Sequence, residues 1–286
     1  MVRIGAIFNP YVNPPEVFRS SVQAAEEAGL PELWLWEDCF RQSGFAAASA
    51  ALAWTDHLIV GIGISPMPLR NAAITAMEIA TIERLFPGRF LPGLGHGVLD
   101  WMGQAGARVA SPLTLMREYV PAVRSLLAGD EVTVVGRYVT LDAVQLASPP
   151  SAAPRVYAAA EGPKTLHLSG EVADGTVLDR HRTPDEIAVQ VAAVRAERAG
   201  RDGAHDIVAY ISAAFGAGGE ERVRAEYPDR SADGRGLWGS PDDVAEGARA
   251  FFDAGVDSLV LLPVGDEPDL AGFYARAGEA ARLVAG

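Results

Sequence analysis

The stretch RVYAAAEGPKTLHLSGEVADGTVL (Arg155 to Leu178) decides the fold, because it contains a strand, a helix and a second strand in direct succession. The apolar runs RVYAAA and GTVL predict buried strands, and the longer segment between them has helical period. Pro163 suits the first turn of that helix, where an amide has no intrahelical acceptor. A strand, a helix and a strand in this order predict one repeat of a parallel sheet.

The same alternation of short apolar runs and helical segments extends over the whole chain. The predicted strands are RIGAIF (3–8), ELWLW (32–36), LIVGIGI (58–64), RFLPGLG (89–95), RVYAAA (155–160), GTVL (175–178), IVAYISAAF (207–215) and SLVLLP (258–263). Eight βα units in 286 residues predict an α/β fold, a closed (β/α)8 TIM barrel made by a single domain over residues 1–286. A doubly wound open sheet with an appended helical piece is the alternative.

Two stretches depart from this repeat. VTVVGRYVTLDAV (132–144) alternates around a central Gly-Arg and predicts a hairpin or extended excursion before the fifth strand. The polar, Gly-rich stretch 216–240 predicts an insertion after the seventh strand. Long loops at that end of a barrel form lids or substrate walls, so we interpret 216–240 as an insertion or lid, with a solvated insertion without function as the alternative.

Composition narrows the class of protein. The net charge of −13 argues against binding to nucleic acid or to an anionic membrane, because both need a basic surface. A single cysteine, Cys39, excludes an internal disulfide and, with no signal-peptide pattern and no long apolar run, predicts a cytoplasmic protein. His57, His167 and His205 have no metal-ligand spacing, so no metal site is expected.

Polar and glycine residues gather where the predicted strands end, which is where TIM barrels place their active sites. In chain order these strand-end groups are Glu37-Asp38-Cys39, Gly61-Ile62-Gly63-Ile64, Gly95-His96-Gly97, Glu161-Gly162-Pro163-Lys164 and Asp179-Arg180-His181-Arg182. Glycine lets the backbone approach a flat or anionic ligand closely, so glycines at several neighbouring strand ends indicate a cofactor across the barrel mouth.

Three blocks of this sequence resemble the bacterial luciferase-like monooxygenase superfamily. They are ERLFPGRFLPGLGHG (83–97), RVYAAAEGPKTLHLSGEVADGTVL (155–178) and WGSPDDVAEGARAFFDAGVDSLVLLP (238–263). The middle block is most similar to the branch of oxidoreductases that depend on the deazaflavin coenzyme F-420. The resemblance implies a (β/α)8 barrel with an insertion after strand seven, and coenzyme F-420 as the cofactor, with FMN as the alternative.

The resemblance also implies a set of cofactor contacts. A non-prolyl cis peptide on strand three of the family corresponds to Gly63-Ile64, and the family's phosphate site corresponds to the start of the Pro163 helix with Arg182 as a distal cation. Lys164, the only lysine of the chain, lies in the first turn of that helix and adds a candidate charge to the site, or is an ordinary solvated residue. The predicted cofactor-binding residues are Asp38, Ile62, Gly63, Ile64, Gly95, His96, Gly97, Ala160, Glu161, Gly162, Pro163, Lys164 and Arg182.

Two positions depart from the branch that oxidises sugar phosphates. Cys39 stands where that branch has a histidine, and Val98 stands where it has a glutamate proton donor. We therefore expect a different substrate, a small enone, imine or similar molecule that exchanges a hydride with coenzyme F-420. His96 is the first candidate for the group that manages the proton, and Asp38 is the second catalytic candidate or a group that orients the ring.

Two other functions remain open at this point: an FMN-dependent luciferase-like monooxygenase, and a barrel that binds flavin without catalysis. Trp36 and Trp101 lie near strand ends and are the tryptophans we expect to contact a substrate. The family's dimer through its second and third helices predicts a homodimer here, because GFAAASAALAW (44–54) is apolar with small side chains; the same segment also suits packing on its own barrel.

Overall fold

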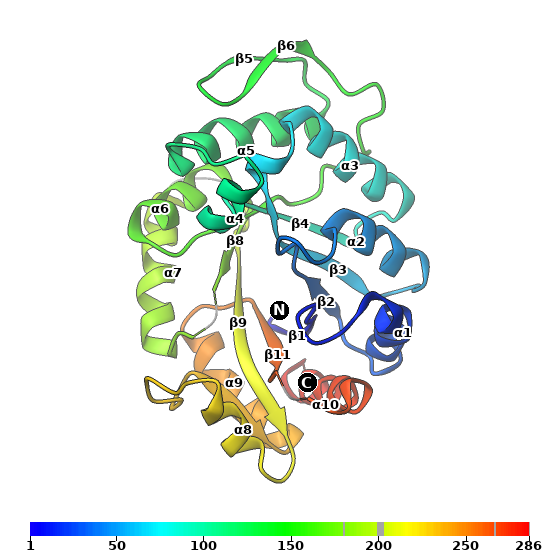
Figure 1. The fold of residues 1–286 in the computed structure, drawn as a ribbon, viewed down its shortest axis with the longest axis vertical. Helices are drawn as coiled ribbons and strands as arrows, with labels where there is room; N and C mark the ends of the chain where they lie inside the picture. Colours follow the sequence, from blue (N-terminus) through cyan, green and yellow to red (C-terminus); the bar gives the residue numbers. More distant parts are fainter. Residues whose placement is uncertain (180, 199–202, 266, 286) are drawn as a thin grey trace.

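Eight parallel strands close into a barrel in the computed structural model, which describes residues 1–179, 181–198, 203–265 and 267–285. Each strand pairs with the next around the ring, and pairing between β8 and β9 completes it (Figure 1). The barrel strands are β1 (Arg3–Phe8), β2 (Glu32–Leu35), β3 (Ile59–Pro66), β4 (Phe90–Gly95), β7 (Tyr157–Ala159), β8 (Gly175–Leu178), β9 (Asp206–Phe215) and β11 (Ser258–Pro263). The predicted TIM barrel is confirmed, and the open sheet is wrong.

Helices surround the strands and cover the outside of the barrel (Figure 1). They are η1 (Pro15–Val17), α1 (Phe18–Glu27), α2 (Gly44–Ala53), η2 (Met67–Leu69), α3 (Ala72–Leu85), α4 (Leu99–Gln104), α5 (Pro112–Ala128), α6 (Pro163–Val172), α7 (Pro184–Arg198), α8 (Gly219–Ala225), α9 (Pro241–Asp253) and α10 (Leu270–Ala285). Among the helices in the described part of the chain, none is both long enough and apolar enough to cross a membrane.

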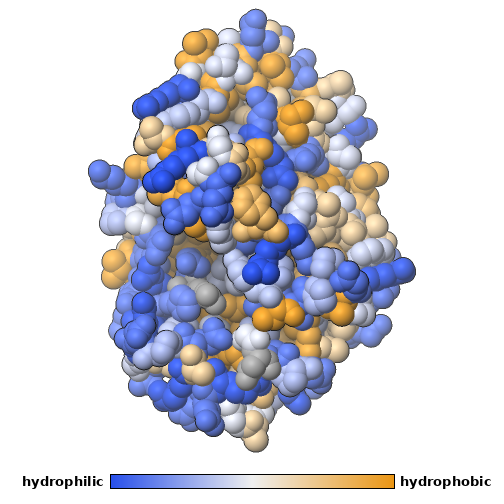
Figure 2. All heavy atoms as spheres, viewed as in Figure 1, coloured by the Kyte–Doolittle hydropathy of each residue, from blue (hydrophilic) through white to orange (hydrophobic). Residues whose placement is uncertain are grey.

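Side chains alternate between the inside and the outside of the barrel, as the twofold period of a strand requires. In β1, Ile7 joins the buried cluster inside the barrel, whereas Ala6 and Phe8 join the larger core between the strands and the helices. The interior cluster is Ile7, Trp34, Tyr157, Val177, Val208, Tyr210, Val260 and Leu262, with Trp36, Ile64 and Leu91 packed against it. All eight barrel strands or their ends supply this cluster, so the barrel is filled and not hollow. In the view of Figure 2, polar and apolar side chains are interspersed over the surface.

The two departures from the βα repeat are visible in the fold. Residues 132–144 form the antiparallel hairpin of β5 (Val132–Val135) and β6 (Thr140–Val144), which lies beyond the helices at the top of Figure 1. This confirms the predicted hairpin. Residues 216–240 contain α8 and end in β10 (Gly236–Gly239), which pairs in parallel with β9 outside the ring.

The N-terminal end of the barrel is closed by an ionic network. Glu32, which begins β2, is fully buried, accepts a hydrogen bond from Ser258 and pairs with Arg3 at 3.3 Å between Oε2 and Nε. Asp206, which begins β9, pairs with Arg155 and accepts a hydrogen bond of 2.9 Å from the Tyr157 hydroxyl. Burial raises the pKa of Glu32 although Arg3 opposes it, while the hydrogen bonds to Asp206 outweigh its burial and lower the pKa of that carboxyl.

Candidate active site

A pocket of about 620 Å³ opens at the C-terminal ends of the barrel strands. This volume lies in the range of small-molecule and cofactor sites. Its walls are formed by residues of the barrel strands and by the segments that follow the strands, as in other TIM barrels. The lining residues are Asn9, Tyr11, Val12, Trp36, Glu37, Asp38, Gly63, Ile64, Pro66, Gly95, His96, Gly97, Val98, Leu99, Trp101, Ala159, Ala160, Glu161, Val177, Asp179, Tyr210 and Gly265.

Asp38, which the sequence predicts as a catalytic or ring-orienting residue, lines this pocket after the end of β2. Its Oδ2 accepts a hydrogen bond of 2.7 Å from the hydroxyl of Tyr11, a second lining residue. The next residue, Cys39, is half-buried, and burial with the nearby carboxylates of Glu37 and Asp38 raises the pKa of its thiol. The thiol is therefore neutral at pH 7, which does not suit a nucleophile.

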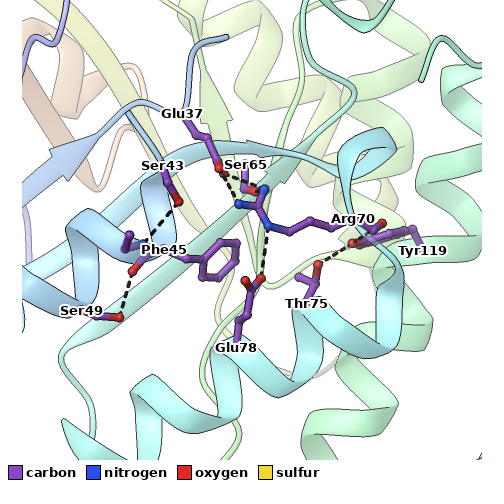
Figure 3. Close-up of polar contacts among 10 residues, drawn as sticks. Glu37, Ser43, Phe45, Ser49, Ser65, Arg70, Thr75, Glu78 and Tyr119 are labelled. Carbon is purple, nitrogen blue, oxygen red and sulfur yellow. Dashed lines mark hydrogen bonds and ion pairs between the residues drawn. The ribbon is translucent and has the colours of Figure 1, made fainter. Parts of the chain in front are cut away.

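Glu37 also lines the pocket, and Arg70 binds both of its carboxylate oxygens (Figure 3). The two hydrogen bonds measure 3.0 Å from Nη1 to Oε2 and 2.6 Å from Nη2 to Oε1. Burial lowers the pKa of Arg70, but Glu37 and Glu78 outweigh it and the net direction is upward. Because both carboxylate oxygens accept hydrogen bonds from one guanidinium, we interpret Glu37 as a structural part of the wall.

His96 lies in the pocket wall directly after β4, half-buried. Its Nδ1 is 2.7 Å from the carbonyl oxygen of Gly97. A carbonyl only accepts, so this contact places a proton on Nδ1 and leaves Nε2 of the neutral ring as the acceptor. The neutral ring is therefore in the tautomer that can take up a proton at Nε2.

A bulge interrupts the pairing of β3 with β4 between Ile62 and Ser65, and its Gly63-Ile64 peptide bond is cis. This confirms the cis bond expected from the resemblance. The hydroxyl of Tyr210, a buried lining residue from β9, donates a hydrogen bond of 3.3 Å to the Gly63 carbonyl. Position 63 requires glycine, because a Cβ atom there would overlap the Tyr210 hydroxyl.

Glycine at two other strand-end positions has local reasons as well. A Cβ atom at Gly95 would lie 2.7 Å from the Ile64 side chain, and Gly97 has a positive φ of 68°. Both glycines line the pocket. The strand-end glycines thus bring the walls of the pocket close to one another, whatever ligand the pocket takes.

The start of α6 follows β7, which pairs with β4 in the barrel. Glu161 lines the pocket and forms an ion pair of 2.7 Å with Arg182, while Gly162 is the N-cap of the helix. A guanidinium therefore lies beside the positive end of a helix dipole, an arrangement that suits an anion. Lys164 is exposed and lines a different hollow on the outer surface, with His167 and Glu197 among its neighbours.

The structure brings most of the predicted site residues together. The predicted residues that line the pocket are Asp38, Gly63, Ile64, Gly95, His96, Gly97, Ala160 and Glu161. Ile62 is fully buried in the core outside the barrel, and Gly162, Pro163, Lys164 and Arg182 lie around the start of α6 without lining the pocket. Their roles in binding a cofactor stay predictions. Trp36 and Trp101 line the pocket, in agreement with their predicted position.

Three residues with evident roles in this site were not singled out from the sequence: Tyr11, Arg70 and Tyr210. Tyr210 lies inside an apolar run, and the other two lie in loops, so no local pattern marks them. None of residues 216–240 lines the pocket as it stands, so their interpretation as a lid stays a prediction. Arg180, part of the predicted strand-six group, lies outside the described residues.

The charge of the pocket is negative. Among the described lining residues are four carboxylates and neither lysine nor arginine; the carboxylates belong to Glu37, Asp38, Glu161 and Asp179. Arg70 balances Glu37 and Arg182 balances Glu161 from outside the lining. The remainder of the wall is largely aromatic and aliphatic and includes Trp36, Val98 and Trp101. Such a pocket favours flat, uncharged groups over free anions.

The sequence of this chain is similar to those of known proteins over most of its length. The sequence model of the luciferase-like monooxygenases matches residues 3–227. A 5,10-methylenetetrahydromethanopterin reductase from Methanolobus tindarius is 32% identical over 188 residues, 65% of this chain and 57% of that relative. A coenzyme F-420-dependent glucose-6-phosphate dehydrogenase from Beutenbergia cavernae is 27% identical over 192 residues, 62% of this chain and 56% of that enzyme. The chain thus spans little more than half the length of either relative.

Among solved structures, a coenzyme F-420-dependent secondary alcohol dehydrogenase in complex with an F-420–acetone adduct superposes with a TM-score of 0.84 at 20% identity. The match covers 99% of both chains, so the whole fold is shared. The family model covers well over half of the chain, from the first strand to beyond the seventh. This chain belongs to the luciferase-like monooxygenase family.

Proposed function

We propose that this protein is an oxidoreductase that transfers a hydride between coenzyme F-420 and a small organic substrate. The observation that carries the proposal is the meeting of the β3 bulge, Asp38 and His96 around one pocket at the C-terminal end of the barrel. The names of the relatives support it, because the glucose-6-phosphate dehydrogenase and the secondary alcohol dehydrogenase both depend on coenzyme F-420.

The residues of the pocket fit such a cofactor. A flat ring system needs a narrow site with a rigid floor, and the bulge at Gly63 and Ile64, supported from below by Tyr210, supplies one. A phosphate needs a local cation, and Arg182 at the start of α6 supplies it, with Glu161 as its present partner. When bound, the deazaflavin supplies a hydride donor or acceptor at its C5 atom.

His96 and Asp38 have different roles in this proposal. His96 keeps Nδ1 engaged with the Gly97 carbonyl and presents Nε2, so it exchanges the substrate's proton at that atom. Asp38 is held by the Tyr11 hydroxyl and orients a polar edge of the ring. Trp36 and Trp101 form apolar walls that keep water from the reacting atoms.

The charge of the pocket limits the classes of substrate that can bind in it. A sugar phosphate needs cationic side chains, and none of the described lining residues is lysine or arginine. Cys39 and Val98 stand where the sugar-oxidising branch has its histidine and glutamate. We therefore propose an uncharged substrate with a polarised double bond, such as an enone or an imine, and not a sugar phosphate.

The test is an equilibrium titration of the purified protein with coenzyme F-420 and, in parallel, with FMN, followed by ligand fluorescence. We expect micromolar affinity for the deazaflavin and much weaker affinity for FMN. Preference for FMN would instead support the alternative function, an FMN-dependent and oxygen-dependent monooxygenase like those after which the family is named. Binding of neither would remove both proposals.

We also propose that the protein is a homodimer that packs through α2 and α3. The exposed side of α3 carries Ile74, Met77 and Leu85, which are 48%, 53% and 66% exposed in the single chain. Three large apolar side chains on one exposed helix are expected to be covered by a partner. Light scattering should give a dimer for the wild type and a monomer for Met77→Glu, whereas a monomeric wild type would contradict the proposal.

A further inference from the structure

Arg70 lies behind the pocket and is not one of its lining residues. It follows the short helix η2, and its side chain is 18% exposed. We propose that Arg70 is a positioning residue that fixes two walls of the pocket relative to each other, the segment 36–38 after β2 and the bulge of β3. The inference goes beyond the proposed function, because it concerns how the pocket is held and does not depend on which cofactor enters it.

The first wall is held through Glu37. Arg70 donates to both carboxylate oxygens, at 2.6 and 3.0 Å, so the position and the rotation of the carboxylate are both defined (Figure 3). Glu37 lies between Trp36 and Asp38, and all three residues line the pocket. A fixed Glu37 side chain therefore fixes the direction in which its two neighbours face the pocket.

The second wall is held through Ser65. The same Nη1 atom that binds Glu37 donates to the Ser65 hydroxyl at 3.2 Å. Ser65 is buried and follows Ile64, so this bond lies one residue from the β3 bulge. One nitrogen atom thus joins the end of β2 to the bulge of β3.

The guanidinium is itself held on its remaining sides. Its Nε atom pairs with Glu78 of α3 at 3.2 Å, and its Cζ atom lies over the Phe45 ring of α2, 5.0 Å from the ring centre (Figure 3). The backbone carbonyl of Arg70 accepts a bond of 3.2 Å from the Tyr119 hydroxyl of α5. Contacts with α2, α3 and α5 therefore fix the position of Arg70, and Arg70 in turn fixes the two walls of the pocket.

Lysine cannot reproduce this arrangement. An ammonium group is a point charge, whereas the guanidinium uses a planar fork for Glu37 and a further edge for Glu78. Arg70→Lys keeps the charge and much of the volume, so the buried Glu37 and the half-buried Glu78 keep a cation nearby. The substitution therefore loosens the two walls without leaving an unpaired charge in the core.

The test is hydrogen exchange of backbone amides in the ligand-free protein, read by mass spectrometry on peptides. Arg70→Lys should exchange about tenfold faster than the wild type in residues 36–41 and 62–66, because local opening becomes easier there. Ser65→Ala should affect residues 62–66 and leave 36–41 unchanged. Unchanged exchange in both segments of Arg70→Lys, or an equal increase throughout the barrel, would overturn the proposal.

Arg124→Lys is the matched control. Arg124 of α5 binds both oxygens of Asp174, at 2.9 Å from Nε and 2.5 Å from Nη2, and also donates to the Val172 carbonyl. Neither Arg124 nor Asp174 lines the pocket. This control should increase exchange near residues 172–174 and leave 36–41 and 62–66 as in the wild type.

A titration with coenzyme F-420 separates this inference from the proposed function. If the wild type binds the deazaflavin, Arg70→Lys should bind it about fivefold more weakly and Arg124→Lys equally well. If the wild type binds no deazaflavin but Arg70→Lys shows faster exchange in both segments, the proposed function fails and the positioning role stands. If affinity falls equally in both variants, Arg70 acts through general stability and the positioning role is refuted.

Discussion

Two buried glutamates flank the short strand β2, Glu32 as its first residue and Glu37 two residues after its last. Glu32 begins the strand at the N-terminal end of the barrel, fully buried between Arg3 and Ser258. Glu37 follows the strand at the C-terminal end, where Arg70 binds it and one side of it faces the pocket. Each pairs with an arginine, yet only Glu37 lies within reach of a ligand.

This difference shows how one barrel separates stability from function. At the N-terminal end, Arg3 pairs with both Glu32 and Asp206 and so closes the barrel, which means that these charges serve the fold. At the C-terminal end, Arg70 holds the backbone segments that carry Asp38 and Ile64 into the pocket. Substitutions at the first end should change the free energy of unfolding, and substitutions at the second should change ligand binding.

The largest effect on the pocket is expected from Gly63→Ala. The added Cβ atom would overlap the Tyr210 hydroxyl, so the β3 bulge must move. A displacement of the bulge should weaken binding of coenzyme F-420 about 100-fold in a fluorescence titration.

The double variant Gly63→Ala with Tyr210→Phe supplies the control for that experiment. Removal of the hydroxyl leaves a ring carbon 3.0 Å from the new Cβ atom, which a small shift relieves. The double variant should recover part of the lost affinity. If it binds no better than Gly63→Ala alone, the clash with Tyr210 is not the cause.

At the N-terminal end, Glu32→Ala should act on stability. The substitution removes the acceptor of the Ser258 hydroxyl and the partner of Arg3 inside the barrel. The free energy of unfolding should fall by about 3 kcal/mol in urea denaturation, with the affinity for coenzyme F-420 unchanged. A stable variant with lost affinity would show that the two ends are not separate.

The same end should make stability depend on pH through His205, which precedes β9. Burial, with a smaller contribution from Arg198, lowers the pKa of His205 to about 4. The unfolded chain therefore binds more protons between the ordinary histidine pKa of about 6.5 and this value. The contribution to stability is complete above pH 6.5 and is lost as the pH falls toward 4.

The measurement is urea denaturation of the wild type and of His205→Gln across that range. Since part of the ring is exposed, we expect the wild type to lose about 1–2 kcal/mol through this residue, and the variant to lack that slope. Parallel pH profiles for both proteins would assign the pH dependence to other groups.

The smallest effect is expected from Tyr11→Phe at the pocket end. The substitution removes the 2.7 Å hydrogen bond to Asp38 and keeps the ring beside Trp36. Loss of one partly exposed hydrogen bond should weaken binding of coenzyme F-420 about threefold, with stability unchanged. A loss as large as that of Gly63→Ala would mean that Tyr11 contacts the ligand directly.

The sequence predicted the barrel well, because strands and helices leave local patterns. Val60 and Ile62 alternate with Gly61 and Gly63 in an apolar run, and that run predicts β3. The helix α4 was missed because its six residues, LDWMGQ, are too few to show a helical period. Strand ends also identified Asp38 and His96 as pocket residues, since the carboxyl ends of parallel strands meet at one edge.

Contacts between residues distant in sequence could not be predicted in this way. Arg70 and Glu37 are separated by 33 positions, and no sequence motif around either residue indicates that the two are in contact. Tyr210 reaches the Gly63 carbonyl across the barrel interior, over 147 positions. The glycine pattern was interpreted through ligand approach, whereas Gly63 and Gly95 also have protein side chains where their Cβ atoms would be.

The most direct test of the separation between the two ends is hydrogen exchange of the wild type with and without coenzyme F-420. We expect slower exchange in residues 36–41, 62–66, 95–101 and 160–165, which border the pocket, and no change in residues 3–5, 30–33 and 205–208 at the N-terminal end. Protection at the N-terminal end, or no protection at the C-terminal end under saturating cofactor, would contradict this expectation.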